Sequence, residues 1–277
     1  MIDLRNGDCL ELVKDIPDKS VDLLLTDPPY LHVKGGCKSK GLNKGVRDTK
    51  SKVVSNMSDF GEKEINEFLD IVKPKMKIFN AYIFCSKLQI PYYLNWALKN
   101  KCQFDVLIWD KDFTGIISRK FFAPNIEYII RIYKKGLNQL DESKYYQKIK
   151  QYKRPKNKVH EAEKPVELLK EFIMLSSNNE DIILDMFMGS GTTGQAVLEV
   201  GNRKFIGIEK DEKHFNIAKV RIEKTLEKMN DDRFKTWWLF RKDELYSLIR
   251  KVFPYANICE ITGNKNTILL RIQEPYL

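Results

Sequence analysis

The sequence predicts an α/β fold with a mostly parallel sheet and helices on both faces. Short apolar runs alternate with segments of helical spacing along the 277 residues, and this alternation is typical of parallel strands joined by crossover helices. A glycine-rich turn follows one of the predicted strands, and a pair of prolines ends another. Hydrophobic residues make up 43% of the chain and charged residues 31%, so there is enough apolar material to bury a core.

The first half of the chain contains four predicted strands and two predicted helices. Residues 21–26 form an apolar run that Asp27-Pro28-Pro29 ends. Residues 62–77 have the spacing of a helix, with one apolar face made of Ile65, Phe68, Leu69 and Val72. The other elements expected here are strands over 81–85, 104–109 and 127–133 and a helix over 91–99.

The second half repeats the alternation more regularly. The elements expected here are a helix over 166–175, a strand over 182–185, a helix over 192–200, a strand over 205–209 and a helix over 214–228. Each strand is followed by a helix, which favours parallel pairing within one sheet.

Three segments stand outside the alternation. Residues 31–60 are polar and rich in Gly and Lys, and segments of that length in a compact domain are often lids or binding loops. Residues 137–158 interleave lysines with tyrosines. Residues 233–277 contain Trp237-Trp238, a predicted helix over 242–251 and a predicted hairpin around Gly263-Asn264. We therefore expect a main domain over 1–232 and a C-terminal extension over 233–277.

Charge and cysteine usage narrow the class of protein. The chain carries 48 Lys and Arg against 38 Asp and Glu, a net charge of +10 that favours phosphate-rich or acidic partners. It has no apolar run long enough for a spanning helix, and its start lacks the pattern of a signal peptide. The five cysteines are scattered and never form a CxxC pair, and His32 with Cys37 is too small a set for a metal. We expect a reduced, cytoplasmic chain without a membrane segment and without a metal site.

A glycine loop marks a candidate cofactor site. Gly189, Gly191 and Gly194 have the G-x-G-x-x-G spacing between a predicted strand and a predicted helix, and Glu209 ends the next strand, where a ribose ligand is expected. Glycines allow a sharp turn and let a cofactor lie against bare main chain. A turn that only joins strand to helix is the alternative. The loop alone would indicate a dinucleotide, but it lies late in the chain, and a more specific motif lies upstream.

That motif is Asp27-Pro28-Pro29-Tyr30, directly after the first buried strand. Together, D-P-P-Y at 27–30 and F-M-G-S-G at 187–191 resemble the S-adenosylmethionine-dependent DNA amino-methyltransferases, which modify an exocyclic amine of adenine or cytosine. The order, with D-P-P-Y first, resembles the permuted beta group of that family. The resemblance runs from about Met1 to about Ile222. It implies a Rossmann-like class I methyltransferase fold with a mostly parallel seven-stranded sheet, a circularly permuted motif order, and a catalytic domain over 1–232.

The resemblance also implies a set of cofactor-binding residues for S-adenosyl-L-methionine. Asn6-Gly7-Asp8-Cys9-Leu10 resembles the segment whose acid contacts the cofactor adenine, and the strand ending at Glu209 resembles the one whose acid holds the ribose hydroxyls. Residues 160–165 resemble the family's HPTQKP segment, with Glu161, Ala162 and Glu163 replacing its Pro, Thr and Gln. The residues assigned in this way are Asp8, Cys9, Lys164, Pro165, Asp185, Phe187, Gly189, Ser190, Gly191, Thr192 and Glu209.

The chemistry of the tetrapeptide supports a role in catalysis. An adenine amine is a poor nucleophile because its lone pair is delocalised into the ring. Acceptors at the Asp27 carboxylate and the Pro28 carbonyl would localise that lone pair, while Pro29 stiffens the turn. Tyr30 offers an aromatic face to a base that has left the duplex stack. A strand-terminating turn is the alternative reading. Resemblance to the family links Asp at position 27 mainly with adenine and Ser with cytosine, which favours adenine N6.

Double-stranded DNA is the expected partner. The basic segment 144–158 falls where the family keeps its target-recognition region, although a solvated linker would have a similar composition. The residues assigned to nucleic-acid binding are Lys34, Lys38, Lys148, Lys153, Arg154 and Lys156. The segment is short for a domain that recognises a DNA sequence alone. We therefore expect residues 34–52 or the C-terminal extension to contribute to target recognition. Alternatively, the extension forms a homodimer contact. A cognate restriction endonuclease would be the expected partner in a restriction-modification system.

The sequence thus predicts a site-specific DNA (adenine-N6)-methyltransferase. The same chemistry on cytosine N4 or on RNA is the first alternative. A nucleic-acid-binding protein with a vestigial pocket is the second, and intact Asp27, Gly189 and Glu209 argue against it. A nicotinamide dehydrogenase is a weaker alternative, because no Tyr-x-x-x-Lys or catalytic His arrangement is present.

Overall fold

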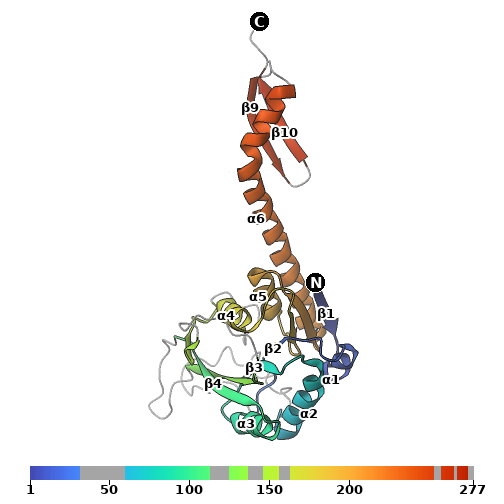
Figure 1. The fold of residues 1–277 in the computed structure, drawn as a ribbon, viewed down its shortest axis with the longest axis vertical. Coiled ribbons are helices and arrows are strands. Elements are labelled where there is room, and N and C mark those ends of the chain that lie inside the picture. The colour runs from blue at the N-terminus through green and yellow to red at the C-terminus, as the bar shows by residue number, and fades with distance from the viewer. Residues whose placement is uncertain are drawn as a thin grey trace, which may run out of the picture. The chain divides into compact units, whose positions relative to one another are not determined.

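The computed structural model describes residues 1–31, 60–112, 125–136, 146–155, 163–252, 257–264 and 267–273 (Figure 1). The chain divides into two compact units, Met1–Ile222 and Glu223–Leu277. The boundary expected after residue 232 therefore lies inside the second unit. Among the described residues, no helix combines the length and the apolar composition that crossing a membrane requires.

Unit 1 is built on one eight-stranded sheet with the order β1-β8-β7-β2-β3-β5-β4-β6. All pairs are parallel except those of β5, which runs antiparallel to both β3 and β4. The strands are β1 (Ile2–Asn6), β2 (Leu23–Thr26), β3 (Asn80–Cys85), β4 (Gln103–Asp110), β5 (Ile126–Tyr133), β6 (Ile149–Gln151), β7 (Ile182–Asp185) and β8 (Lys204–Glu209). The Rossmann-like α/β class is confirmed, whereas the expected number of seven strands is wrong by one.

Two of these strands, β1 and β6, are not predicted from the sequence. Strand β1 reads Ile-Asp-Leu-Arg-Asn and is only half-buried, because it lies at one edge of the sheet and pairs with β8 alone. Strand β6 has three residues inside the lysine-rich segment and pairs with β4 at the other edge. Both strands therefore lack the continuous apolar run that marks a central parallel strand.

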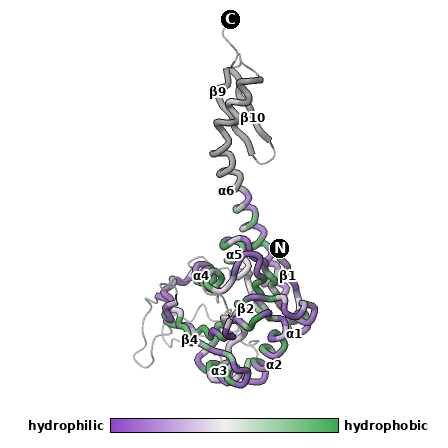
Figure 2. Tube along the Cα trace, viewed as in Figure 1, coloured by the Kyte–Doolittle hydropathy of each residue, from purple (hydrophilic) through white to green (hydrophobic). Residues whose placement is uncertain are grey.

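Helices cover both faces of the sheet, as expected. Strand β2 shows this directly, because Leu24 belongs to one apolar cluster while Leu23 and Leu25 belong to the other. The first cluster includes apolar residues of α2 (Glu62–Val72) and α3 (Ile90–Lys99), and the second those of α4 (Val166–Ser176), α5 (Thr192–Val200) and the start of α6 (Glu212–Val252). Apolar and polar positions alternate along these helices (Figure 2). A short helix, α1 (Cys9–Leu12), follows β1.

Two helices differ in length from the expectation. The helix predicted over 62–77 ends at Val72 and is followed by a 3-10 turn over Lys73–Lys75, because Pro74 has no backbone N–H to continue the hydrogen bonds of the helix. The separate helices predicted over 214–228 and 242–251 are parts of the single helix α6, which contains neither Gly nor Pro. The predicted hairpin is confirmed as β9 (Asn257–Asn264) paired with β10 (Thr267–Gln273).

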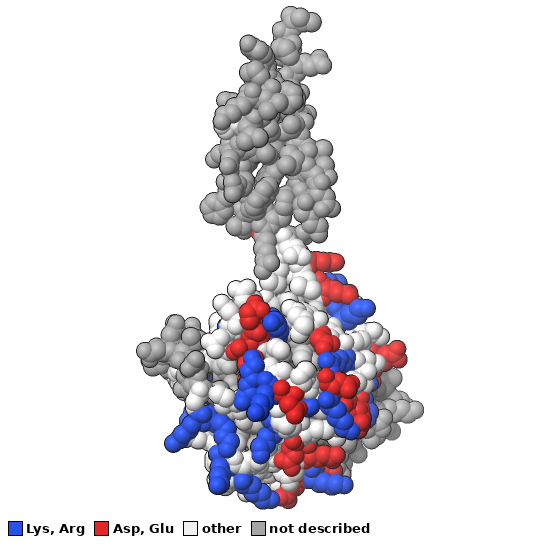
Figure 3. Space-filling view, turned by 45° about the vertical axis from the view of Figure 1, so that its right-hand side comes forward, with Lys and Arg blue, Asp and Glu red and all other residues white. Residues whose placement is uncertain are grey.

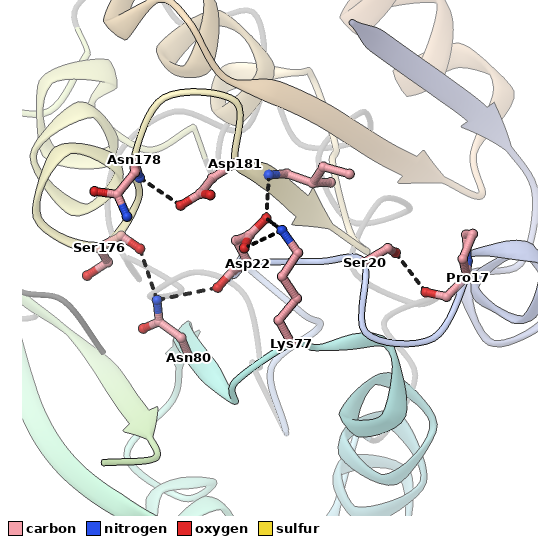
Figure 4. Close-up of polar contacts among 9 residues, drawn as sticks. Pro17, Ser20, Asp22, Lys77, Asn80, Ser176, Asn178 and Asp181 are labelled. Carbon is pink, nitrogen blue, oxygen red and sulfur yellow. Dashed lines mark hydrogen bonds and ion pairs between the residues drawn. The ribbon is translucent and has the colours of Figure 1, made fainter. Parts of the chain in front are cut away.

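Polar contacts tie the amino ends of three central strands together (Figure 4). The Asp22 carboxylate accepts hydrogen bonds from Lys77 Nζ at 2.9 Å and from the backbone N–H of Ile182 at 2.9 Å. The Asn80 side-chain amide donates to the carbonyl of Ser176 at 3.0 Å. These contacts join the segments before β2 and β7 to the start of β3. The two sequence motifs lie at the opposite end of the sheet, where the parallel strands have their carboxyl ends. This end is called the active edge below.

Candidate active site

The two motifs lie on adjacent strands, although they are far apart in the sequence. Strands β2 and β7 pair in parallel with Leu24 opposite Leu184, so Asp27 and the glycine loop follow neighbouring strand ends. Thr26 Oγ1 donates a hydrogen bond to Asp185 Oδ1 at 2.7 Å, and the backbone N–H of Phe187 donates to the same oxygen at 3.1 Å. Burial raises the pKa of Asp185 to about 6, and these donors act against that rise. The Asp185 side chain therefore ties the two motifs to each other.

The glycine loop has the backbone geometry that the sequence requires of it. Gly189 and Gly191 have φ values of +56° and +82°, a region that side chains disfavour. A Cβ at Gly191 would lie 2.8 Å from Ala218 Cβ, so α6 packs directly against this turn. At Gly189 the nearest atom to an added Cβ is the Phe187 carbonyl oxygen at 4.0 Å. Among the described residues, no side chain therefore covers the main chain at Gly189 on the side where a Cβ would point, and a ligand could lie against it there. The glycine loop at this point is called the glycine cradle below.

Two acidic residues lie beside this cradle. Glu209 Oε2 accepts a hydrogen bond from the backbone N–H of Gly189 at 2.7 Å. Strand β1 pairs with β8 so that Asn6 lies opposite Glu209, which brings Asp8 to the same edge. Asp8 Oδ1 accepts from the backbone N–H of Leu10 at 3.0 Å and caps α1, while Oδ2 pairs with Lys210 at 2.9 Å. The hydrogen bond from Lys210 lowers the pKa of Asp8.

The remaining residues assigned to the cofactor differ in what they contact. Burial raises the pKa of Cys9 to about 12, so its thiol is neutral. The Phe187 ring packs edge-on against Phe60 and Phe68, with centroid distances of 5.6 and 5.5 Å. Pro165 is buried and precedes α4 as its N-cap residue.

Ser190 and Thr192 direct their side chains toward helix α6. Arg221 Nη1 donates to Thr192 Oγ1 at 2.6 Å and to Ser190 Oγ at 3.4 Å. Arg221 Nη2 also pairs with Glu163 Oε1 at 2.8 Å. One guanidinium therefore joins the glycine loop to the segment before α4, which is a contact that the sequence did not indicate.

The carboxylate of Asp27 pairs with a lysine through its Oδ2 oxygen. Asp27 Oδ2 lies 2.5 Å from Lys164 Nζ. Asp27 Oδ1 is buried and has no hydrogen-bond partner among the described residues. Burial raises the pKa of Asp27, Lys164 acts to lower it, and Glu127 acts to raise it. Lys164, which the resemblance assigns to the cofactor, is thus found beside the carboxylate of Asp27.

Glu127 and Lys111 also belong to this site, although the sequence analysis did not single them out. Glu127 Oε1 pairs with Lys111 Nζ at 2.6 Å, and Oε2 lies 3.2 Å from both Lys164 Nζ and the Tyr30 hydroxyl. The Lys164 ammonium lies 5.5 Å from the centroid of the Tyr30 ring. The available signal was a single acid at the start of the apolar strand predicted over 127–133.

The residues assigned to nucleic acid are only partly described. Lys34, Lys38 and Lys156 lie outside the described residues, as do His32 and Cys37. Lys148 pairs with Asp105 at 2.7 Å, and Lys153 is 82% exposed and 3.9 Å from Asp112. Figure 3 shows acidic and basic side chains interspersed over one described face of unit 1, so the net positive charge does not collect there. Within the described ranges, no group of three or more His, Cys, Asp or Glu could hold a metal ion.

The basic segment is anchored to unit 1 through β6. Lys150 Nζ and the Tyr152 hydroxyl contact the two oxygens of Glu171 on α4, each at 2.5 Å. Trp109 Nε1 donates to the carbonyl of Tyr152 at 2.7 Å. Burial of Lys111 lowers its pKa, and Arg154 acts in the same direction with a smaller effect. The basic segment therefore approaches the group formed by Glu127, Lys111 and Lys164.

Comparisons with known proteins identify the family of the chain. A family model described as DNA methylase matches residues 21–220. The type II methyltransferase M.HinfI of Haemophilus influenzae is 29% identical over 265 residues, covering 82% of this chain and 70% of the relative. M.BamHI of Bacillus amyloliquefaciens is 31% identical over 245 residues, covering 74% of this chain and 54% of the relative. The DNA adenine methyltransferase YhdJ of Escherichia coli is 28% identical over 252 residues, covering 79% and 81%.

Solved structures extend the likeness to the fold. The M1.HpyAVI complex with S-adenosylmethionine has a TM-score of 0.61 at 26% identity and covers 80% of this chain and 99% of that one. The cytosine-N4-specific PvuII DNA methyltransferase has a TM-score of 0.58 at 18% identity, which shows the fold alone. With the D-P-P-Y turn and the glycine cradle at one sheet edge and the model matched over residues 21–220, the chain belongs to the N6/N4 family of DNA methylases, the S-adenosylmethionine-dependent amino-methyltransferases.

Proposed function

We propose that this protein methylates the N6 amine of adenine in double-stranded DNA. The observation that carries the proposal is the Asp27 carboxylate, which has one oxygen paired with Lys164 and the other, Oδ1, buried without a partner among the described residues. A buried acceptor without a donor is costly, so Oδ1 is suited to receive an N–H group from a bound substrate. Asp at this position of the motif favours adenine, and YhdJ, a relative, is named as a DNA adenine methyltransferase.

The residues of the turn would activate the amine. Asp27 Oδ1 accepts one N–H of the target amine and the Pro28 carbonyl accepts the other, so the lone pair is localised on nitrogen. Tyr30 stacks on the extruded base and holds the amine in line with the methyl group. Bound S-adenosylmethionine supplies an electrophilic methyl group on a sulfonium sulfur. The nitrogen would gain a bond to the methyl carbon as the bond from that carbon to sulfur breaks, which leaves a neutral thioether. The nitrogen would also lose one proton, for which the Asp27 carboxylate is the proposed acceptor.

The cofactor would be held by the cradle beside β8. The bare main chain at Gly189 would lie against the cofactor, the Glu209 carboxylate would bind the ribose hydroxyls, and Asp8 would contact the adenine. The observations that support this arrangement are the open side of Gly189 and the hydrogen bond between Gly189 N and Glu209 Oε2. The carboxylates also suit a ligand that carries a positive charge.

The basic segment would contact the DNA backbone, with Lys148, Lys153 and Arg154 as its described members. Unit 2 would add DNA contacts or join a second copy of the chain. A cognate restriction endonuclease is the partner that we propose, because the relatives M.HinfI and M.BamHI are named type II methyltransferases.

Methyl transfer from labelled S-adenosylmethionine to duplex DNA of mixed sequence tests the function. Nucleoside mass spectrometry should find the label in N6-methyladenine. Label in N4-methylcytosine would show that the target base is cytosine rather than adenine. Label in RNA alone would show that the substrate is RNA rather than DNA. The variant Asp27→Asn should lose turnover while its affinity for S-adenosylmethionine, measured by calorimetry, stays unchanged. Full turnover in that variant would contradict the role of Asp27.

A further inference from the structure

The direction of strand β5 brings an acid into the active site from an unexpected position. Because β5 is antiparallel to β4, its first residues lie where β4 ends, and Glu127 is directly opposite Trp109. The other motifs come from the ends of the parallel strands β2, β7 and β8. The start of β5 therefore places the Glu127 side chain at the end of the sheet where these parallel strands have their carboxyl ends.

Glu127 contacts three groups of this edge through two oxygens. Its Oε1 pairs with Lys111 Nζ at 2.6 Å. Its Oε2 accepts from the Tyr30 hydroxyl at 3.2 Å and pairs with Lys164 Nζ at 3.2 Å. The Lys164 and Lys111 side chains are only 8% and 11% exposed, so water screens these contacts weakly.

The four charged groups balance one another. Asp27 and Glu127 supply two negative charges, and Lys164 and Lys111 supply two positive charges. Without the charge of Glu127, Lys111 would lose its partner and, of the two carboxylates, the Lys164 ammonium would pair with that of Asp27 alone. The carboxylate would then hold its electrons more tightly and become a weaker acceptor for an amine N–H.

We propose that Glu127 is a positioning residue for methyl transfer, which orients the Tyr30 ring and shares Lys164 with Asp27 so that Asp27 Oδ1 keeps its strength as an acceptor. The inference rests on the proposed roles of Asp27 and Tyr30 and extends them to a residue outside the motif. In the same direction, burial raises the pKa of Asp27, Lys164 opposes this rise, and Glu127 supports it.

The test is the pH dependence of single-turnover methylation in three variants. Glu127→Gln keeps an acceptor for the Tyr30 hydroxyl but removes the charge. We expect the rate to fall by between about tenfold and a hundredfold, and the acid limb of the profile to move to lower pH, because the pKa of Asp27 falls. Lys111→Gln removes a positive charge from the same cluster, so its acid limb should move to higher pH. The double variant restores the balance of charge and should return the limb toward that of the wild type.

The surroundings of Glu127 determine how the profile is interpreted. The titratable and charged groups that act on it or on its partners are Asp27, Tyr30, Cys85, Lys111, Arg154 and Lys164. Glu167→Gln is the matched control, because this exposed acid of α4 pairs only loosely with Lys170, at 3.3 Å, and its profile should equal that of the wild type.

Opposite shifts in the two single variants support a role through charge. The inference is overturned if Glu127→Gln retains the wild-type rate or if the acid limbs of the two single variants move in the same direction. It is also overturned if Glu127→Gln changes only the KM for S-adenosylmethionine. The proposed function fails separately, because it fails when the wild-type protein places no label in N6-methyladenine. Should the wild-type product be N4-methylcytosine, the same variants are scored on that product. Lys111→Gln keeps the test decisive if Glu127→Gln does not fold.

Discussion

The buried side-chain amide of Gln89 donates a hydrogen bond to the carbonyl oxygen of Pro29 at 2.9 Å. The same nitrogen donates to the carbonyl of Phe60 at 2.9 Å, and Gln89 Oε1 accepts from the backbone N–H and the hydroxyl of Ser86, both at 3.0 Å. Pro29 belongs to the D-P-P-Y turn, and Phe60 lies just before helix α2. One fully buried side chain therefore joins the D-P-P-Y turn to the residue that lies just before α2.

Replacing Gln89 by Glu should weaken the fold and slow methylation. The carboxylate has the same shape but would face two carbonyl oxygens that have lost their donor, so we expect a loss of about 2–4 kcal/mol in the free energy of unfolding. Urea unfolding measures the loss, and single-turnover methylation measures the effect on the turn. Ser86→Ala is the control, because it removes one hydroxyl contact and leaves both donors in place. Equal stability of the Glu variant and the wild type would contradict the role of Gln89.

An alanine at Gly191 would meet both backbone strain and a collision. Gly191 has a φ of +82° and a ψ of 21°, which is the left-handed region, and its Cβ would lie 2.8 Å from Ala218 Cβ. The backbone region alone costs about 1–2 kcal/mol. Gly191→Ala should therefore lower the free energy of unfolding by more than this penalty and should also weaken binding of S-adenosylmethionine. Thermal unfolding and calorimetry provide the two measurements, and a loss of only about 1–2 kcal/mol would exclude a contribution from packing.

The pKa of Asp185 predicts a signed dependence of stability on pH. Burial raises this pKa from 3.8 to about 6, so the folded protein binds the proton more tightly than the unfolded chain does. Its favourable contribution is complete below about pH 4 and is lost as the pH rises through about 6. Asp185→Asn cannot titrate, so the wild type should lose stability relative to this variant between pH 4 and 6, by about 3 kcal/mol at most. Urea unfolding across that range is the measurement, and a constant difference would contradict the raised pKa.

Salt dependence tests the contact of the basic segment with DNA. Lys153 is 82% exposed, and if it neutralises one phosphate, Lys153→Gln should reduce the slope of log affinity against log salt by about 0.9. The control is Lys99→Gln, an exposed lysine at the end of α3, next to the edge where β4 begins. Fluorescence anisotropy with a labelled duplex gives both slopes. The same slope for Lys153→Gln and the wild type would remove this residue from the interface.

Much of the fold could be predicted because central parallel strands have a local signature. Strands β2, β3 and β7 are apolar runs that end at turn residues, and the glycine loop and the D-P-P-Y turn mark the edge where those strands end. Strand β6 could not be predicted, because Lys150 is buried only through its distant partner Glu171. The continuity of α6 was missed because its polar middle section resembles a linker in composition.

The part of the site that escaped prediction depends on strand direction. Nothing in residues 126–133 says which way the strand runs, and Glu127 reaches the active edge only because β5 is reversed between β3 and β4. Lys164 was assigned to the cofactor by resemblance, whereas its contact with Asp27 joins residues that are 137 positions apart. Contacts of this kind emerge from the assembled sheet rather than from any local pattern.

The reversed strand also has a consequence for protein engineering. Because β5 is antiparallel to β4, the end of β4 and the start of β5 are neighbours. The backbone N–H of Lys111 accordingly donates a hydrogen bond to the Asn125 carbonyl at 2.8 Å. These two positions form a ready pair of graft points at the reacting edge. A different sequence could be joined at these two positions while the pairing of all eight strands stays as it is. The reversal of β5 therefore offers a point at which sequence can be exchanged without disturbing the order of the strands.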